Sequence, residues 1–187
     1  MVLWWIIPSI VLAQDRCESY RLAVRKSHQK YLGPAYPWKF GLAQLKVESN
    51  CRNITAFDGG TGVAQFMPST AKYVSTLMKS PFLPSNPAQA INAQAFYISH
   101  IHKKENWGHK PLWVDYQIYN GGKANLYKEY QRAEVLSHFE MRQACKRKII
   151  QLKSGPLDLC SVNYRYSEKI YDFAKLFDKS LESMRYW

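Results

Sequence analysis

The sequence predicts a single, mainly α-helical domain with at most a short β-hairpin. Apolar residues recur at helical spacing over most of the 187 residues, whereas the alternation typical of strands is weak throughout. Glycine and proline clusters stand between these segments, where helices are expected to stop and start. The length suits one domain with a substantial core, and no repeat, low-complexity tract or linker divides it.

Each expected helix has an apolar face or a start or stop signal. In the first, at residues 16–30, Tyr20, Ala23 and Val24 share a face. Asn86-Pro87-Ala88-Gln89 combines an Asn cap, a proline at the first helical position and a Gln three residues after the cap, so a helix is expected from there to about residue 104. The helix at 111–119 is expected to stop at Asn120-Gly121-Gly122. The remaining helices are expected at 38–49, 69–79, 134–152 and 166–183, and the hairpin near 53–63.

The first thirteen residues are apolar and carry no charged side chain. This run is short for crossing a bilayer, and Pro8 interrupts it. Val11-Leu12-Ala13 resembles a signal-peptidase site, so residues 1–13 are expected to be a secretory signal peptide. The usual basic segment is missing, which leaves an uncleaved apolar leader or a buried segment open. Residues 14–187 then form the domain, and the protein is expected to be exported to the periplasm or cell envelope, or to be carried by a virion.

The four cysteines, Cys17, Cys51, Cys145 and Cys160, agree with export. Their number is even and none forms a C-x-x-C pair, which argues against zinc. Of the three possible pairings, Cys17–Cys51 and Cys145–Cys160 join neighbours in sequence and are the expected disulfides. Buried free thiols are the alternative.

The net charge of +12 indicates an anionic partner, such as nucleic acid, acidic lipid headgroups or carboxylate-bearing cell-wall polymers. Charge alone does not choose among them. The sequence contains no nucleic-acid motif and no basic helix suited to a groove, so no nucleic-acid partner is expected. The five histidines form no H-E-x-x-H pattern, so neither a metal nor another cofactor is expected.

Glu48 ends an apolar helical stretch and is followed by a glycine-rich turn. A carboxyl group in apolar surroundings has its charged form disfavoured, so its pKa rises and it can keep a proton near neutral pH. That property suits a general acid. Taken alone, Glu48 would be interpreted as a solvated glutamate at a helix end.

Four blocks of sequence change this interpretation. They are Glu48-Ser49, residues 59–68 with the sequence GGTGVAQFMP, residues 93–98 with AQAFYI, and residues 118–122 with IYNGG. In this order and spacing they resemble the family 1 lytic transglycosylases, the soluble-lytic-transglycosylase catalytic domain. A weaker fifth match is Tyr166-Ser167-Glu168-Lys169-Ile170. The resemblance covers about residues 38–170 and implies a lysozyme-like fold of the goose-type lysozyme/transglycosylase kind.

The resemblance implies that Glu48 is the single catalytic acid and base. Ser49 would position Glu48 or the substrate, and Tyr166 would form a hydrogen bond near the carboxylate. The residues implied to contact the glycan are Ser49, Gln65, Phe66, Met67, Tyr119, Asn120 and Tyr166. The chain departs from the family pattern at Cys51, Ala64, Gln94 and Ile118, which puts the finer substrate preference in doubt.

The implied reaction cleaves the β-1,4 bond between N-acetylmuramic acid and N-acetylglucosamine in peptidoglycan glycan strands and forms 1,6-anhydromuramoyl ends. The expected setting is local wall opening for a secretion, conjugation or virion machine, with membrane association through the leader only. A goose-type lysozyme, which hydrolyses the same bond, is the first alternative, and its second carboxylate would be Asp58, Glu105 or Asp115. A non-catalytic glycan-binding module and a basic membrane-surface protein are the others.

Overall fold

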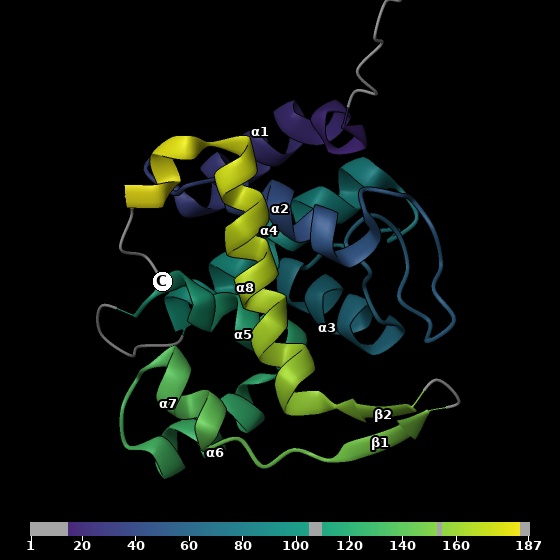
Figure 1. The fold of residues 1–187 in the computed structure, drawn as a ribbon. Coiled ribbons are helices and arrows are strands. Elements are labelled where there is room, and N and C mark those ends of the chain that lie inside the picture. The colour runs from purple at the N-terminus through teal and green to yellow at the C-terminus, as the bar shows by residue number, and fades with distance from the viewer. Residues whose placement is uncertain (1–14, 105–109, 153–154, 184–187) are drawn as a thin grey trace, which may run out of the picture.

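The computed structural model describes residues 15–104, 110–152 and 155–183, and the leader expected at 1–13 lies outside them. Helices dominate this part of the chain, and one short hairpin projects from its lower end (Figure 1). Among the described residues, no helix is long and apolar enough to cross a membrane. In chain order the elements are a 3₁₀ helix at Arg16–Tyr20, α1 Arg21–Leu32, α2 Lys39–Ser49, α3 Pro68–Met78, α4 Pro87–Lys104, α5 Leu112–Gly121, α6 Lys123–Ala133, α7 His138–Gln143, β1 Ile149–Leu152, β2 Gly155–Asp158, α8 Leu159–Phe177 and a 3₁₀ helix at Lys179–Ser183.

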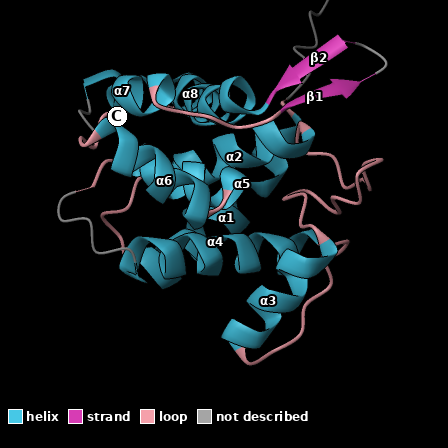
Figure 2. Cartoon of the chain, turned by 90° about the horizontal axis from the view of Figure 1, so that it is seen from below, coloured by secondary structure: helices cyan, strands magenta, loops and turns pink. Residues whose placement is uncertain are grey.

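Helix α2 lies in the middle of the molecule, between α8 and α1 (Figures 1 and 2). Its residues 40–45 are all buried, because apolar side chains surround this helix on nearly every side. Gly41 lets α1 approach closely, since a Cβ there would lie 2.2 Å from the ring of His28. On α8, Tyr166, Ile170 and Ala174 repeat every four residues and form the buried stripe that packs on α2.

The first five expected helices are confirmed, with small shifts at their ends. Their apolar periodicity and their caps are local signals, and the structure follows them. The start of α4 is an example, because the Asn86 side chain accepts hydrogen bonds from the backbone N–H groups of Ala88 and Gln89 at 3.1 and 3.2 Å.

The expected helix at 134–152 is wrong. Only α7 is helical there, and β1 pairs with β2 in an antiparallel hairpin. The β-branched pair Ile149-Ile150 favours a strand. Gly155 (φ +118°) and Pro156, which follow this pair, are both unsuited to the interior of a helix. The segment expected as a hairpin near 53–63 is instead a compact loop with isolated bridges from Thr61 to Thr55 and to Phe66.

One further helix and one helix boundary also differ from the expectation. Helix α6 was not predicted, because Gly122 (φ +79°), which stops α5, also starts α6 without a side-chain cap. Helix α8 begins seven residues before the expected position, at Leu159. There the Asp158 carboxylate caps the helix by accepting a hydrogen bond from the Cys160 N–H at 2.9 Å.

The structure contains disulfides between Cys17 and Cys51 and between Cys145 and Cys160. The first joins the N-terminal 3₁₀ helix to the second residue after α2, and both cysteines are buried in the core. The second joins the segment after α7 to the first turn of α8 and closes the base of the hairpin.

Replacing Cys17 and Cys51 by alanine is expected to lower the free energy of unfolding by about 4 kcal/mol, and replacing Cys145 and Cys160 by about 3 kcal/mol. The order follows from the sequence separations of 34 and 15 residues, because the longer loop restricts the unfolded chain more. Urea unfolding of the oxidised proteins measures both values. A larger loss for the second pair would contradict the loop-entropy account.

Candidate active site

Glu48 lies in the last turn of α2, where the chain turns sharply. Asn50 and Cys51 both have left-handed backbone conformations (φ 53° and 55°), and the Asn50 N–H donates to the Lys46 carbonyl at 3.0 Å. This is a left-handed stop for a helix without a glycine. The disulfide to Cys17 holds the turn, so the position of Glu48 is fixed by both backbone and covalent constraints.

A cavity of about 420 Å³ opens at Glu48. Three segments that are far apart in sequence form its walls: the end of α2, the loop of residues 56–67 with the start of α3, and the end of α5. Six residues expected from the sequence line it together, namely Glu48, Gln65, Phe66, Met67, Tyr119 and Asn120. The structure adds lining residues that the sequence interpretation did not assign to the groove, namely Ala56, Gly60 and Thr70.

A chain of buried hydrogen bonds ends on the Glu48 carboxylate. The Tyr166 hydroxyl donates to Glu48 Oε1 at 2.5 Å, and Gln44 Nε2 donates to the Tyr166 hydroxyl oxygen at 2.9 Å. Gln94 Nε2 donates in turn to Gln44 Oε1 at 2.8 Å. Both glutamines are fully buried. Tyr166 therefore supports Glu48 from inside the protein, and the sequence interpretation missed both Gln44 and Gln94 as parts of the site.

Burial is the main cause that raises the pKa of Glu48 to about 7; the hydrogen bond from Tyr166 opposes it, and the nearby charge of Asp58 adds to it. Glu48 is thus close to half-protonated at neutral pH. Burial and the charge of Glu48 hold the pKa values of Tyr119 and Tyr166 well above their usual 10, so both phenols keep their protons.

Two residues fix the loop that forms the cavity wall. Ser49 Oγ donates to the Val63 carbonyl at 2.9 Å, and the Tyr119 hydroxyl donates to the Ala64 carbonyl at 3.2 Å. Ser49 is buried beneath the loop and is not among the residues that line the cavity. Its place therefore fits support of the loop better than contact with a sugar.

Gln65 also shapes the loop. It has a left-handed backbone (φ 49°), and its Nε2 donates to the carbonyls of Gly62 and Ile54 at 2.7 and 3.1 Å. Gly62 has φ +81°, and a Cβ there would lie 1.8 Å from the Pro84 carbonyl oxygen, so only glycine fits.

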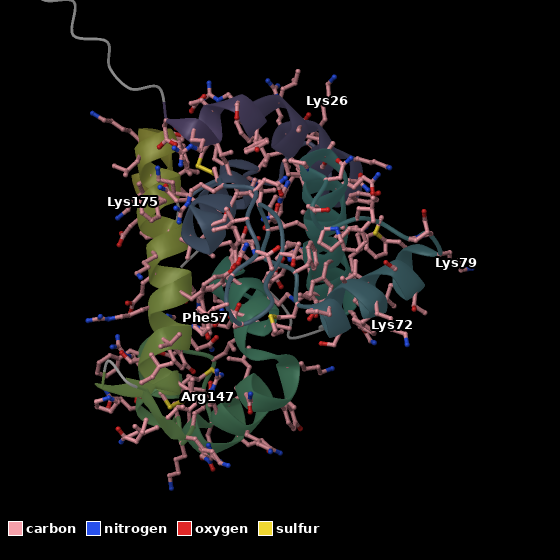
Figure 3. All side chains as sticks on the ribbon, turned by 90° about the vertical axis from the view of Figure 1, so that its right-hand side faces the viewer. Lys26, Phe57, Lys72, Lys79, Arg147 and Lys175 are labelled. Atoms are coloured by element: carbon pink, nitrogen blue, oxygen red, sulfur yellow. A yellow bond between two sulfur atoms is a disulfide. The ribbon has the colours of Figure 1, made fainter. Side chains whose placement is uncertain are left out.

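The apolar residues expected in the groove differ in their accessibility. Phe66 is only 2% exposed, and its ring lies edge-on to that of Phe82, with 5.0 Å between the ring centroids. Phe66 therefore mainly supports the cavity wall from inside. Met67 is 39% exposed and offers an accessible apolar surface. Phe57, between two lining residues, is fully exposed at the rim (Figure 3).

The three candidates for a second carboxylate differ in position. Asp58 lines the cavity, and its Oδ1 accepts a hydrogen bond from the Gly60 N–H at 3.1 Å. Asp115 is fully buried between Lys110 at 2.8 Å and His102 at 2.7 Å and is not a lining residue. Glu105 lies outside the described residues. Within the described ranges, no group of three or more His, Cys, Asp or Glu residues could hold a metal ion.

The mainly helical, lysozyme-like fold places the chain beside solved lytic transglycosylases. An inactive mutant of the lytic transglycosylase Slt from Pseudomonas aeruginosa has a TM-score of 0.64 and 19% sequence identity, over 88% of this chain and 25% of that chain. The 70 kDa soluble lytic transglycosylase from Escherichia coli has a TM-score of 0.65 and 15% sequence identity, over 89% of this chain and 26% of that chain. A complex of the 70 kDa soluble lytic transglycosylase with bulgecin A has a TM-score of 0.63 and 14% sequence identity, over 91% of this chain and 26% of that chain.

The chain therefore spans about a quarter of the length of these solved structures, and the matched region includes most of this chain. At these identities the likeness shows the fold. No protein-family profile matches the chain, and a search of curated protein sequences gave no match.

Replacing Glu48 by glutamine is expected to stabilise the protein by about 2 kcal/mol above pH 7, after allowance for the partial exposure of Glu48. The carboxyl titrates near 4.5 when unfolded and near 7 when folded. Between these values the folded state binds the extra proton, so the stability of the parent protein falls as pH rises. Urea unfolding from pH 4 to 8 measures the difference, which should vanish below pH 4.5. A difference that does not depend on pH would contradict the raised pKa.

Replacing Tyr166 by phenylalanine is expected to raise the pKa of Glu48 by about one unit, because the carboxylate loses a charge-assisted hydrogen bond. Carbon-13 NMR titration of the Glu48 carboxyl measures this shift. Tyr119→Phe is the matched control, since its hydroxyl donates to the Ala64 carbonyl instead. Equal shifts in both variants would show that the Tyr166 contact has no particular effect.

Proposed function

We propose that this chain is a peptidoglycan lytic transglycosylase that cleaves the β-1,4 bond between N-acetylmuramic acid and N-acetylglucosamine and forms 1,6-anhydromuramoyl ends. One observation carries the proposal: a carboxyl group with a pKa near 7, Glu48, lies in a cavity and is supported from below by Tyr166. The likeness in fold to proteins that are lytic transglycosylases supports it.

In this proposal Glu48 acts twice. As an acid, it protonates the glycosidic oxygen, and positive charge develops at C1 of the muramic acid residue. The N-acetyl group of the substrate can stabilise that charge. The Glu48 carboxylate then accepts the proton of the C6 hydroxyl as its oxygen closes onto C1. Water is not consumed, and a pKa near the working pH suits a group that must give and take a proton.

The walls of the cavity suit a glycan strand. Asn120 is exposed and can hydrogen-bond sugar hydroxyls or N-acetyl groups, and the thioether of Met67 can contact the apolar face of a ring. Tyr119 would serve mainly by holding the loop that carries Gln65. Tyr166 would tune Glu48 rather than contact the sugar, because it is buried beneath the carboxylate.

The alternative is a hydrolase of the goose-type lysozyme kind. Asp58 lines the same cavity and would be the base that activates water. A non-catalytic module is less consistent with a carboxyl group whose pKa lies near 7. Export remains our expectation, because two disulfides suit an oxidising compartment. A secretion, conjugation or virion machine as the setting also remains a prediction.

Muropeptides released from purified cell walls are expected to end in 1,6-anhydro-N-acetylmuramic acid. Their mass is that of the lysozyme product less one water, and borohydride leaves them unreduced because the anomeric carbon is locked in a ring. Mass spectrometry before and after borohydride treatment distinguishes the two products. Reducible muramic acid ends as the main product would exclude the transglycosylase and favour Asp58 as a base.

Glu48→Gln provides the catalytic control for this assay. The amide has nearly the same shape but cannot donate the proton, so release should fall at least ~10²-fold while the fold is kept. Tyr119→Phe and Tyr166→Phe should reduce it less, because each removes one hydrogen bond. Near-normal release by Glu48→Gln would mean that another group is the acid.

A further inference from the structure

Another cavity, of about 300 Å³, lies between α6, residues 146–148 and the start of α8. Figure 1 shows these elements at the lower end of the molecule. Basic side chains dominate its lining. The lining contains five of them and one acid, namely Lys128, Arg132, Lys146, Arg147, Lys148 and Glu129.

Arg147 is fixed at the base of this cavity. Its side chain is only 10% exposed, and its Nε donates to Glu129 Oε1 at 2.7 Å. The other oxygen of Glu129 accepts a hydrogen bond from the Tyr164 hydroxyl at 2.8 Å. Arg147 Nη2 is buried without a hydrogen-bond partner, although buried polar atoms are rarely left unpaired. Arg147 and Glu129 thus neutralise one another, and one guanidinium donor is still unsatisfied.

The other four cations keep their charge. Lys128, Arg132, Lys146 and Lys148 are exposed, and none forms an ion pair with an acidic side chain of the described residues. Four unneutralised cations around one small cavity attract an anion with more than a single charge or a surface that bears many.

Exposed apolar side chains directly follow the lining residues along the chain, at the start of the hairpin. Ile149 and Ile150 directly follow the basic residues and are 63% and 42% exposed. At about 3.3 Å per residue in a strand, both lie within ~7 Å of Lys148 along the chain, and because successive side chains of a strand point to opposite faces, each face of the hairpin carries one of them. Val162, one turn after Leu159 of the cavity wall, is 41% exposed. This surface therefore combines cations and exposed aliphatic groups, as membrane-surface segments do.

We propose that the Arg147 cavity binds the phosphate headgroup of an anionic phospholipid, with Ile149 and Ile150 at the acyl-chain boundary. Phosphate chemistry matches the three exposed lysines and the exposed guanidinium of Arg132. The aliphatic side chains favour a lipid surface over nucleic acid or a free anion, because neither of those covers apolar groups. The domain thus has a membrane contact of its own, in addition to the one expected from the leader.

The two cavities are close neighbours. A Cβ on Gly121 would lie 2.5 Å from Arg147 Nη1, while the preceding residue, Asn120, lines the cavity at Glu48. The end of α5 therefore separates them. A membrane bound at the Arg147 cavity therefore lies close to the cavity at Glu48.

Sedimentation with vesicles tests the proposal. The full chain is expected to partition more strongly onto phosphatidylcholine vesicles that contain phosphatidylglycerol than onto phosphatidylcholine alone. Lys146→Ala/Lys148→Ala should reduce the ratio of the two partition coefficients by about 30-fold, roughly fivefold for each lysine. Residues 1–13 are identical in every variant, and the neutral vesicles measure what they contribute. At high salt, which screens the charges, Ile149→Ser/Ile150→Ser should bind the anionic vesicles more weakly than the parent protein does at the same salt.

Lys26→Ala/Lys72→Ala is the matched control, because it removes the same charge from exposed helical positions far from Arg147 (Figure 3). The ratio should stay within about twofold of the parent value. An equal loss in both double variants would reduce the effect to net charge and overturn the site. Binding of inorganic phosphate or DNA without a preference for the anionic vesicles would overturn the lipid assignment. Glu48→Gln should bind vesicles normally, so this test is independent of the wall-cleaving activity.

Discussion

The structure around Glu48 depends on one buried chain of hydrogen bonds, from Gln94 through Gln44 and Tyr166 to the carboxylate. It crosses α4, α2 and α8, the helices that form the centre of the molecule. Each link satisfies a polar group that would cost about 1–3 kcal/mol if it were buried alone. The same contacts that pack the core therefore also determine where the carboxyl oxygen lies.

This arrangement resolves a conflict between two requirements on Glu48. In the proposed mechanism, the carboxyl must be desolvated to hold a proton near pH 7, yet its charged form must exist long enough to take a proton back. Burial and the charge of Asp58 favour the neutral form, and the phenol of Tyr166 favours the charged form. Because these effects oppose one another, the pKa stays near 7 instead of rising until the group is permanently neutral.

The sequence predicted the parts of this site that have local signals. Glu48, Gln65 and Tyr119 stand in blocks with recognisable spacing, and the helices that carry them have apolar periodicity or stop signals. Gln44 and Gln94 were missed, because a glutamine on an apolar face looks like a surface residue until its partners on other helices are known. The hairpin at 149–158 was missed although the Cys145–Cys160 disulfide was expected, because residues 134–152 have helical periodicity and the pairing of β1 with β2 depends on the fold of the segment as a whole.

Oxidation and the site are physically coupled at the end of α2. Ser49, the last residue of α2, is followed by two residues in left-handed conformations, which cost energy in residues other than glycine. Cys51 is one of them, and its bond to Cys17 keeps the turn in place against the core. In a reducing compartment nothing covalent would oppose relaxation of this turn, and the last turn of α2 would be free to fray with Glu48 on it. The disulfide thus links the geometry of the carboxyl group to an oxidising environment, which is also where a polymer outside the cytoplasmic membrane would be found.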